Sequence, residues 1–283
     1  MNNPDYTIRP MTRDEVDLAV EWAAQEGWNP GLSDAECYFA ADTHGFLVGV
    51  LNGEPIACIS AVRYNETFGF IGFYIVKPEY RGQQYGIRIW KAAMEYLQGC
   101  NVALDGVVAQ QQNYQKSGFE LAYRNIRYEG PVPENLTSSE RCTDLTRVPF
   151  AEVEAYNNRF FPADRAQFLR RWINQPDSHA LGILENNRLL ACGVIRPCQT
   201  GYKIGPLYAE SEPLAEALLV DLIARLTPGS RFYLDVPEVN SAAVALAEHY
   251  NMQVSFETAR MYTGEQPQLP LAELYGVTSF EIG

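Results

Sequence analysis

The chain of 283 residues has few of the residues that build metal sites and disulfide frameworks. It contains three histidines and six cysteines, and no two cysteines form a Cys-x-x-Cys pair. The closest two, Cys192 and Cys198, have no histidine beside them. Scattered cysteines in a chain of this length are typical of reduced thiols in a cytoplasmic protein. The sequence therefore predicts no metal site and a cytoplasmic location.

Long apolar runs and basic residues are also scarce. No apolar stretch of about 18 residues occurs, and the first residues lack the basic and apolar regions of a signal peptide, so neither a transmembrane helix nor a signal peptide is expected. The 22 Lys and Arg against 35 Asp and Glu give a net charge of −13. Such a charge repels phosphate backbones and anionic lipid. We therefore expect no nucleic-acid or membrane partner, whereas a small cationic molecule would be attracted.

What is present is ample material for a globular core. Hydrophobic residues make up 47% of the chain, and its length fits one large domain or two ordinary ones. Periodicity predicts the order β-α-α-β-β-β-loop-α-β-α-β over residues 1 to about 130. A similar order returns in the second half, and the halves end alike, with Tyr-Glu-Gly at 128–130 and Tyr-Thr-Gly at 262–264.

This repeat predicts two copies of one α/β (α+β) fold, each a mixed, mostly antiparallel sheet flanked by helices. The expected units are a first domain at 1–133, a linker at 134–143 and a second domain at 144–283. The alternation of apolar and polar residues over 277–282 predicts a last strand across the interface between the domains.

The most informative segment lies at 73–87. A strand ends before Pro78, a loop containing Gly82 and Gly86 follows, and a helix then begins. The first N–H groups of a helix are unpaired and carry the positive end of the helix dipole, so they form a cradle for an anion. Arg81 adds a positive charge. Taken alone, the segment is better interpreted as a plain strand-to-helix connection with turn glycines.

Two motifs in this half resemble those of the GNAT acetyltransferase family. Arg81 and Gly86 match the ends of the acyl-CoA signature Q/R-x-x-G-x-G/A, although Gln84 occupies the position of its middle glycine. Downstream, Tyr114 and Gly118-Phe119 fall on the family segment Tyr-x-x-x-Gly-Phe. The resemblance extends over nearly all of residues 6–130.

Two wider segments, at 26–31 and 104–114, resemble one bacterial GNAT subfamily that carries a second GNAT-like domain. The resemblance implies acetyl-CoA as co-substrate, with the strand at 74–76 bonding its pantetheine arm and the N–H groups of 82–87 holding its pyrophosphate. The β-carbon of Gln84 is expected to hinder the closest approach of that pyrophosphate. The implied cofactor-binding residues are Tyr74, Ile75, Val76, Arg81, Gly82, Gln83, Gln84, Tyr85, Gly86, Ile87 and Asn113.

The implied chemistry is attack of a neutral amine on a thioester, after which the departing thiolate needs a proton. Tyr114 is the candidate acid, and simple packing against the sheet is its alternative role. Glu26 is a candidate base or a solvated carboxylate at a helix end. No cysteine falls in the motif to carry the acyl group, so direct attack in a ternary complex is expected. The candidate substrate-pocket residues, each of which has a plain structural role as its alternative, are Trp28, Tyr64, Phe73 and Asp105.

The second half lacks these signals. No loop rich in arginine and glycine follows its corresponding strand at 203–207, and the segment 208–213 is acidic, so this copy is expected to be degenerate for coenzyme A. Arg196, Tyr202 and Lys203 are interpreted as solvated strand residues, with a polar ligand patch as the alternative.

The sequence thus predicts an N-acetyltransferase that acts on the primary amine of a small molecule. Two alternatives stay open. One is a non-catalytic sensor that binds an acyl-CoA or an amino compound, and the other is an acyltransferase that uses a longer acyl chain or a sugar or aminoacyl amine. Both a monomer and a homodimer fit a tandem chain.

Overall fold

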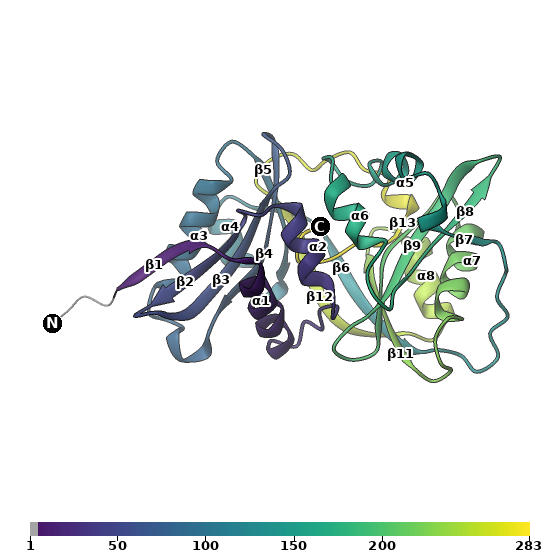
Figure 1. Cartoon of the computed structure of the whole chain (residues 1–283), viewed down its shortest axis with the longest axis horizontal. Coiled ribbons are helices and arrows are strands. Elements are labelled where there is room, and N and C mark those ends of the chain that lie inside the picture. Colours follow the sequence, from purple (N-terminus) through teal and green to yellow (C-terminus); the bar gives the residue numbers. More distant parts are fainter. Residues whose placement is uncertain (1–4) are drawn as a thin grey trace.

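The computed structural model describes residues 5–283 and contains one mixed sheet of 13 strands with helices on its faces (Figure 1). This arrangement confirms the predicted fold class of mixed, mostly antiparallel sheets flanked by helices. Among the described residues, no helix has the length and apolar character needed to cross a membrane. The strands follow the order β1-β2-β3-β4-β5-β12-β6-β11-β10-β9-β8-β7, with β13 paired to β10.

Local sequence signals set the boundaries of the first-half elements. Thr12 and Glu15 form a reciprocal capping box at the start of α1. Asn52 and Gly53 both adopt positive φ, as a tight hairpin turn between β2 and β3 requires. The elements are β1 (Tyr6–Pro10), α1 (Arg13–Gln25), α2 (Asp34–Ala41), β2 (Phe46–Leu51), β3 (Glu54–Arg63), β4 (Phe68–Val76), α3 (Tyr85–Tyr96), β5 (Asn101–Val107), α4 (Gln111–Lys116) and β6 (Glu120–Pro131).

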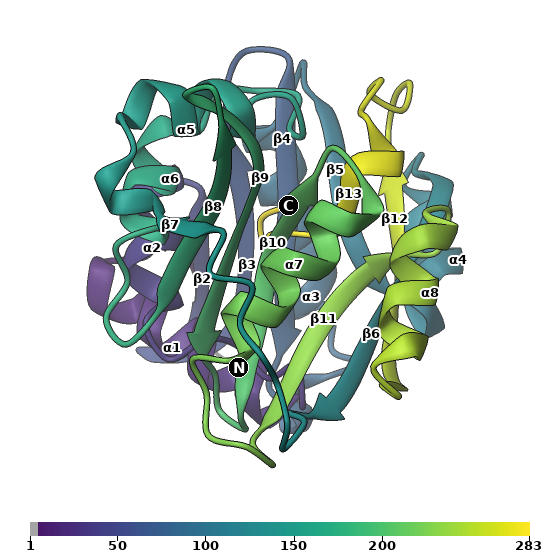
Figure 2. The same ribbon diagram turned by 90° about the vertical axis from the view of Figure 1, so that its right-hand side faces the viewer.

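The second half repeats this succession, and Figure 2 shows α7 and α8 lying over its strands. Asn240 caps α8 by accepting a hydrogen bond from the Ala243 N–H. The elements are β7 (Cys142–Asp144), α5 (Phe150–Asn157), α6 (Ala166–Trp172), β8 (His179–Glu185), β9 (Arg188–Pro197), β10 (Tyr202–Ala209), α7 (Glu212–Ile223), β11 (Arg231–Pro237), α8 (Ser241–His249), β12 (Gln253–Tyr262) and β13 (Leu274–Gly276).

The two halves exchange their long last strands. β12 of the second half pairs with β5 of the first, and β6 of the first half pairs with β11 of the second. Two buried ion pairs join these exchanged strands to their hosts, one between Arg127 and Asp235 and the other between Arg260 and Asp105. Residues 134–141 run without regular structure from β6 to β7. The domain boundaries at 133 and 144 stay predictions.

Each half contains a pair of parallel strands that separates part-way along. In the first half, β4 and β5 pair over 68–71 and 101–104 and then diverge. In the second, β10 and β11 pair over 202–204 and 232–234 and then diverge. In the first half, Phe73 lies just beyond the point of divergence, and its φ of 47° bends β4 away from the regular strand path.

The second opening is filled by the chain itself. β13 enters it and pairs with β10, and the Val277 N–H donates to the carbonyl oxygen of Asp235 on the facing strand. The prediction of a last strand over 277–282 is therefore wrong, because the strand spans Leu274–Gly276. Residues beyond it leave the sheet and cross to the first half, where the carbonyl of Glu281 lies against Gly72. The space left by the missing side chain of Gly72 permits that approach.

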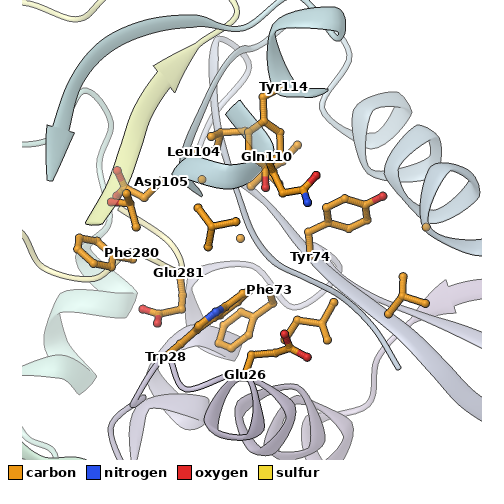
Figure 3. A pocket seen from close by; sticks show the side chains of 18 of the residues that line it. Glu26, Trp28, Phe73, Tyr74, Leu104, Asp105, Gln110, Tyr114, Phe280 and Glu281 are labelled. Carbon is orange, nitrogen blue, oxygen red and sulfur yellow. The ribbon is translucent and has the colours of Figure 1, made fainter. Parts of the chain in front are cut away.

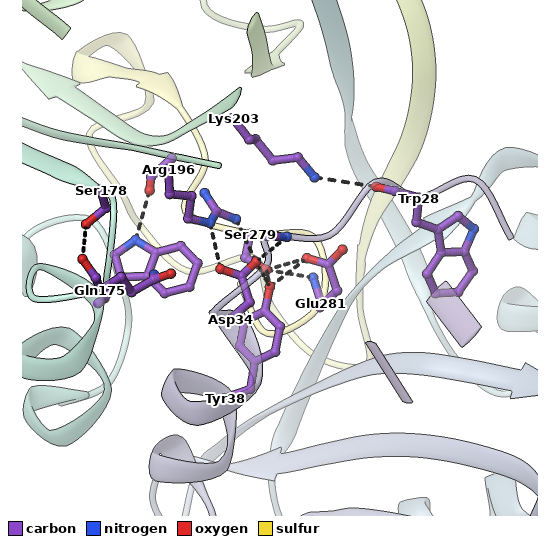
Figure 4. A network of polar contacts seen from close by, with 12 residues as sticks. Trp28, Asp34, Tyr38, Gln175, Ser178, Arg196, Lys203, Ser279 and Glu281 are labelled. Atoms are coloured by element: carbon purple, nitrogen blue, oxygen red, sulfur yellow. Dashed lines mark hydrogen bonds and ion pairs between the residues drawn. The ribbon is translucent and has the colours of Figure 1, made fainter. Parts of the chain in front are cut away.

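Buried polar residues also connect the halves (Figure 4). Arg196 and Lys203 are only 1% and 2% exposed, so the interpretation of these two as solvated strand residues is wrong. Arg196 forms two hydrogen bonds to Asp34 at 2.7 and 3.0 Å. Lys203 donates to the carbonyl oxygen of Trp28 at 3.4 Å. Residues from both halves thus hydrogen-bond one another in the interface, where the Nη1 of Arg196 has no partner among the described residues.

Candidate functional site

The opening between β4 and β5 leads into a cavity of about 550 Å³. Its walls come from both strands, from the loop and first turn of α3, and from second-half residues on β12 and the segment 277–283. Figure 3 shows Tyr114 and Tyr74 entering from first-half elements and Phe280 and Glu281 from the chain end. A fold that separates two parallel strands thus creates an open slot with main-chain groups at its edge.

The loop before α3 presents unpaired donors to this cavity. None of the main-chain N–H groups of residues 82–87 donates a hydrogen bond within residues 5–283. Gly82, Gln84, Gly86 and Ile87 line the cavity at this end. Unpaired N–H groups at a helix start attract an anionic group such as a phosphate. The geometry therefore suits an anionic phosphate group.

Gln84 takes over the backbone role of the missing glycine. Its φ of 68° and ψ of 2° place it in the left-handed region, directly before the first residue of α3. That conformation costs a residue with a β-carbon about 1 kcal/mol or more. The loop therefore keeps a turn that glycine favours, at the expense of local strain.

Replacing Gln84 with glycine is expected to relieve this strain. We expect the free energy of unfolding to be up to about 1 kcal/mol higher in the variant, which is then more stable than the parent. We also expect it to bind acetyl-CoA at least as tightly as the parent. Urea unfolding and calorimetry measure the two quantities. A loss of stability on Gln84→Gly would show that the glutamine side chain contributes more than its backbone conformation costs.

The structure brings most of the predicted cofactor-binding residues to the cavity, and their role in binding stays a prediction. Three of them lie elsewhere. Gln83 donates to the Glu79 carbonyl oxygen, Tyr85 packs on Tyr6 with ring centres 4.8 Å apart, and Asn113 donates to Gln110. Those that line the cavity are Tyr74, Ile75, Val76, Arg81, Gly82, Gln84, Gly86 and Ile87.

Tyr114 lies at the wall between β5 and α4. Its ring covers Gly106, where an added β-carbon would come within 2.2 Å of the ring. The ring also packs beside Trp90, with ring centres 5.6 Å apart. The hydroxyl makes no hydrogen bond within the described chain. Burial, with a smaller contribution from Tyr74, raises the pKa of Tyr114 to about 12. The phenol therefore keeps its proton at neutral pH.

Glu26 lines the cavity, but its carboxylate is already engaged. It accepts a hydrogen bond from the guanidinium of Arg81, whose Nε also donates to the Val76 carbonyl oxygen at 2.8 Å. Because the N–H and C=O of one strand residue point to the same edge, the Val76 N–H also faces the open slot.

The predicted substrate-pocket residues have different positions. Trp28 and Phe73 line the cavity. Asp105 does too, but both its oxygens bind Arg260, at 2.8 and 2.6 Å, and Asn125 adds a third hydrogen bond. Tyr64 lies outside the cavity lining, and its hydroxyl donates to the carbonyl oxygen of Ile282. Tyr64 thus secures the segment that completes the cavity.

Sequence reasoning missed the second-half wall. The cavity is also lined by Phe256, Thr258, Phe280 and Glu281, although they lie 149 or more residues after the end of β5. The alternation over 277–282 pointed to the domain interface, but no motif linked these residues to the first-half site. The described residues include no group of three His, Cys, Asp or Glu side chains placed to hold a metal ion.

Comparison with known proteins decides the family. The model of the acetyltransferase (GNAT) family matches residues 13–119, and that of an acetyltransferase (GNAT) domain matches residues 153–276. Holothin acyltransferase of Pseudoalteromonas sp. (strain SANK 73390) is 30% identical over 278 residues, covering 98% of this chain and 95% of that protein. The chain belongs to the GNAT acetyltransferase family. Because the two matches fall on the two halves, it is a tandem GNAT protein.

Solved structures share this tandem GNAT fold. A putative acetyltransferase from Pyrococcus horikoshii aligns with a TM-score of 0.83 at 23% identity, covering 100% of this chain and 99% of that one. A tandem GNAT protein from the clavulanic acid biosynthesis pathway aligns with a TM-score of 0.65 at 9% identity, covering 93% and 100%. At these identities the likeness establishes the fold alone. The GNAT family assignment supports acyl transfer as the class of reaction.

Proposed function

We propose that this GNAT protein transfers an acetyl group from acetyl-CoA to the primary amine of a small molecule, by direct attack in a ternary complex. The observation that carries the proposal is the open slot between β4 and β5, which ends at a loop whose N–H groups are unpaired. The slot offers main-chain partners to the pantetheine arm, and the loop holds the pyrophosphate. The relative named holothin acyltransferase supports transfer of an acyl group.

The bound acetyl-CoA supplies an activated acyl carbon and a thiolate leaving group. The Val76 N–H faces the slot and polarises the thioester carbonyl, because a fixed donor stabilises the oxyanion that forms during attack. Tyr114 lies across the slot on α4, protonated, and gives its proton to the departing sulfur. These two groups serve the carbonyl and the leaving group, and a third must receive the proton of the amine.

Only the first half binds acetyl-CoA in this proposal. The corresponding slot of the second half is occupied by β13, which pairs with β10 at Leu207 and Tyr208. Beyond it, the carbonyl oxygens of Val277 and Thr278 lie against Gly205. A pantetheine arm would have to displace this packed segment. We therefore expect one acetyl-CoA site per chain.

The part of the cavity away from the α3 loop is aromatic. Trp28 and Phe73 line it from the first half, and Phe256 and Phe280 from the second. Arg127 holds this wall by donating to the Trp28 carbonyl oxygen at 2.7 Å. Its guanidinium carbon also lies 4.9 Å from the centre of the Phe280 ring. Flat apolar bodies pack well on such walls. The acceptor we propose is thus an amine on a flat, apolar small molecule.

Two measurements on the full chain test the proposal. Calorimetry with acetyl-CoA should give one site, and a panel of 2-phenylethylamine, tyramine, tryptamine and spermidine should show CoA release, with the aromatic amines faster than spermidine. Binding without turnover of any amine would favour the sensor alternative. Faster turnover with a longer acyl-CoA would replace acetyl in the proposal, and absence of acyl-CoA binding would overturn it.

Tyr114→Phe is expected to lower kcat about 100-fold, because the thiolate then leaves without its proton donor. The acetyl-CoA affinity should change little, since the ring that packs on Gly106 and Trp90 remains. Steady-state kinetics and calorimetry on the same preparation separate the two effects. Parent-like kcat in this variant would remove Tyr114 from the mechanism.

A further inference from the structure

Three carboxylates line the cavity, and they differ in their partners. Glu26 is bound by Arg81, and Asp105 is bound by Arg260. Glu281 has no Lys or Arg nitrogen within 4 Å among the described residues, although it is only 3% exposed. A buried carboxylate without a cation contact is costly unless something at the site compensates it. Glu281 is therefore the lining carboxylate that is still able to receive a cation or a proton.

Neutral groups hold Glu281 in place. Its Oε2 accepts from Ser279 at 2.5 Å and lies 3.2 Å from the Tyr38 hydroxyl. Tyr38 has one proton to donate, and Asp34 competes for it at 3.0 Å. The main-chain oxygen of Glu281 accepts from Ser60 at 3.3 Å. No hydrogen bond from residues 5–283 reaches Oε1, so this oxygen keeps its full capacity as an acceptor.

The cations nearest to Glu281 make their hydrogen bonds to other groups, and the Nη1 of Arg196 is buried without a partner among the described residues. Arg196 donates twice to Asp34, and Arg127 donates twice to Asp235 and once to the Trp28 carbonyl oxygen. Lys203 donates to the Trp28 carbonyl oxygen. Figure 4 shows Lys203 joined to Trp28, and Arg196 and Tyr38 converging on Asp34 beside Glu281. These charges offset that of Glu281 at a distance and leave its Oε1 without a direct contact.

We propose that Glu281 is the catalytic base that receives the proton of the acceptor ammonium. The inference rests on the proposed acetyl transfer and adds the group that this mechanism lacks. It assigns the second half a chemical role, because residues 277–283 carry the base from that half into the first-half slot. Figure 3 shows Glu281 beside Trp28 and Phe280, at the aromatic part of the cavity, with Tyr114 on a different wall.

The proton balance closes with these groups. Glu281 takes one proton from R–NH₃⁺, and the neutral nitrogen attacks the thioester carbon to form the C–N bond. The C–S bond breaks, and the sulfur takes the Tyr114 proton. The new amide nitrogen then loses one proton, which returns to the Tyr114 oxygen. Glu281 releases to water the proton that it took from the ammonium. The products are one amide, one CoA thiol and one proton.

Glu281→Gln in the full chain tests the assignment, with acetyl-CoA and whichever amine of the panel above turns over fastest. We expect kcat/KM at pH 7 to fall about 100-fold, while the acetyl-CoA affinity and the melting temperature stay close to those of the parent. Above pH 7 the variant should gain about tenfold per pH unit until the pKa of the amine is reached, because only the free amine then reacts. The parent should depend less steeply on pH.

A matched variant, Glu26→Gln, decides between the two carboxylates that have been considered as base. If Glu26→Gln shows the loss and the steep pH profile and Glu281→Gln does not, the base is Glu26 and the assignment is overturned. A loss in Glu281→Gln without the steeper pH profile would make Glu281 a positioning residue, which also overturns it. If the parent acetylates no amine, the proposed function itself fails. If the parent is active and Glu281→Gln has the same kcat/KM, only the assignment of Glu281 is overturned.

Discussion

Replacing Gly86 with aspartate is expected to abolish acetyl-CoA binding while the chain stays folded. Gly86 lies in the first turn of α3, among the unpaired N–H groups at the cavity. A β-carbon there would come within 2.8 Å of the Tyr74 hydroxyl and 3.2 Å of Val76. A carboxylate adds a negative charge where the pyrophosphate should bind, which reverses the attraction of the helix start for anions. Calorimetry with acetyl-CoA measures the loss.

Gly86→Ala is the matched control for this prediction. It introduces the same β-carbon without the charge, and the atom nearest to it is the far end of the Tyr74 side chain, which is able to shift. We therefore expect Gly86→Ala to bind acetyl-CoA with a modest loss. Equal binding by Gly86→Asp and the parent would place the pyrophosphate elsewhere, and equal loss in both variants would mean that space, rather than charge, controls the site.

Asp235→Ala is expected to lower the free energy of unfolding by about 3–5 kcal/mol, because it leaves the buried guanidinium of Arg127 without its partner. The two residues form two hydrogen bonds at 2.6 and 2.7 Å, and both are at most 3% exposed. This pair joins β6 of the first half to β11 of the second. Chemical unfolding followed by circular dichroism measures the change.

Removing both charges should restore most of that stability. In Arg127→Met with Asp235→Leu, the ion pair is removed as a whole, and apolar side chains fill similar space.

The ion pair also predicts that stability depends on pH in the acid range. Burial favours a higher pKa for Asp235, but the charges of Arg127, Lys203 and Arg196 together bring it below its usual value. Its contribution is therefore complete above about pH 4 and disappears on further acidification. If Asp235→Ala alone had the same free energy of unfolding as the parent, the ion pair would not contribute the stability expected here.

Local sequence signals were sufficient for most of the secondary structure and for the strand-to-helix loop before α3. Hydrophobic periodicity predicted the repeated order of strands and helices, because the period of a strand or helix is a property of neighbouring residues. The loop glycines and Arg81 marked the strand-to-helix turn for a similar reason. Gln84 seemed a defect in the motif, yet its backbone adopts the left-handed turn with φ at 68°. Backbone conformation at one residue depends on its context, which a motif does not describe.

Such local signals do not determine which strands pair when they lie far apart in the sequence. The exchange of β6 and β12 depends on which strand edges meet, and the alternation along each strand is the same whichever neighbour it has. The burial of Arg196 and Lys203 follows from the docking of one half on the other, so their charge alone suggested solvated positions.

The amino-acid order thus contained the two-copy architecture, the family motifs and the first-half location of the proposed acyl-CoA loop, all of which lie in contiguous segments. The closed second slot and the proposed acceptor wall required the folded chain. β13 fills the slot of its own half, and residues after it bring Phe280 and Glu281 to a cavity built by β4 and β5. The contacts of Phe280 and Glu281 with β4 and β5 join residues about 170–210 positions apart. Their free energy comes from burial and hydrogen bonding that exist only once both halves have packed together.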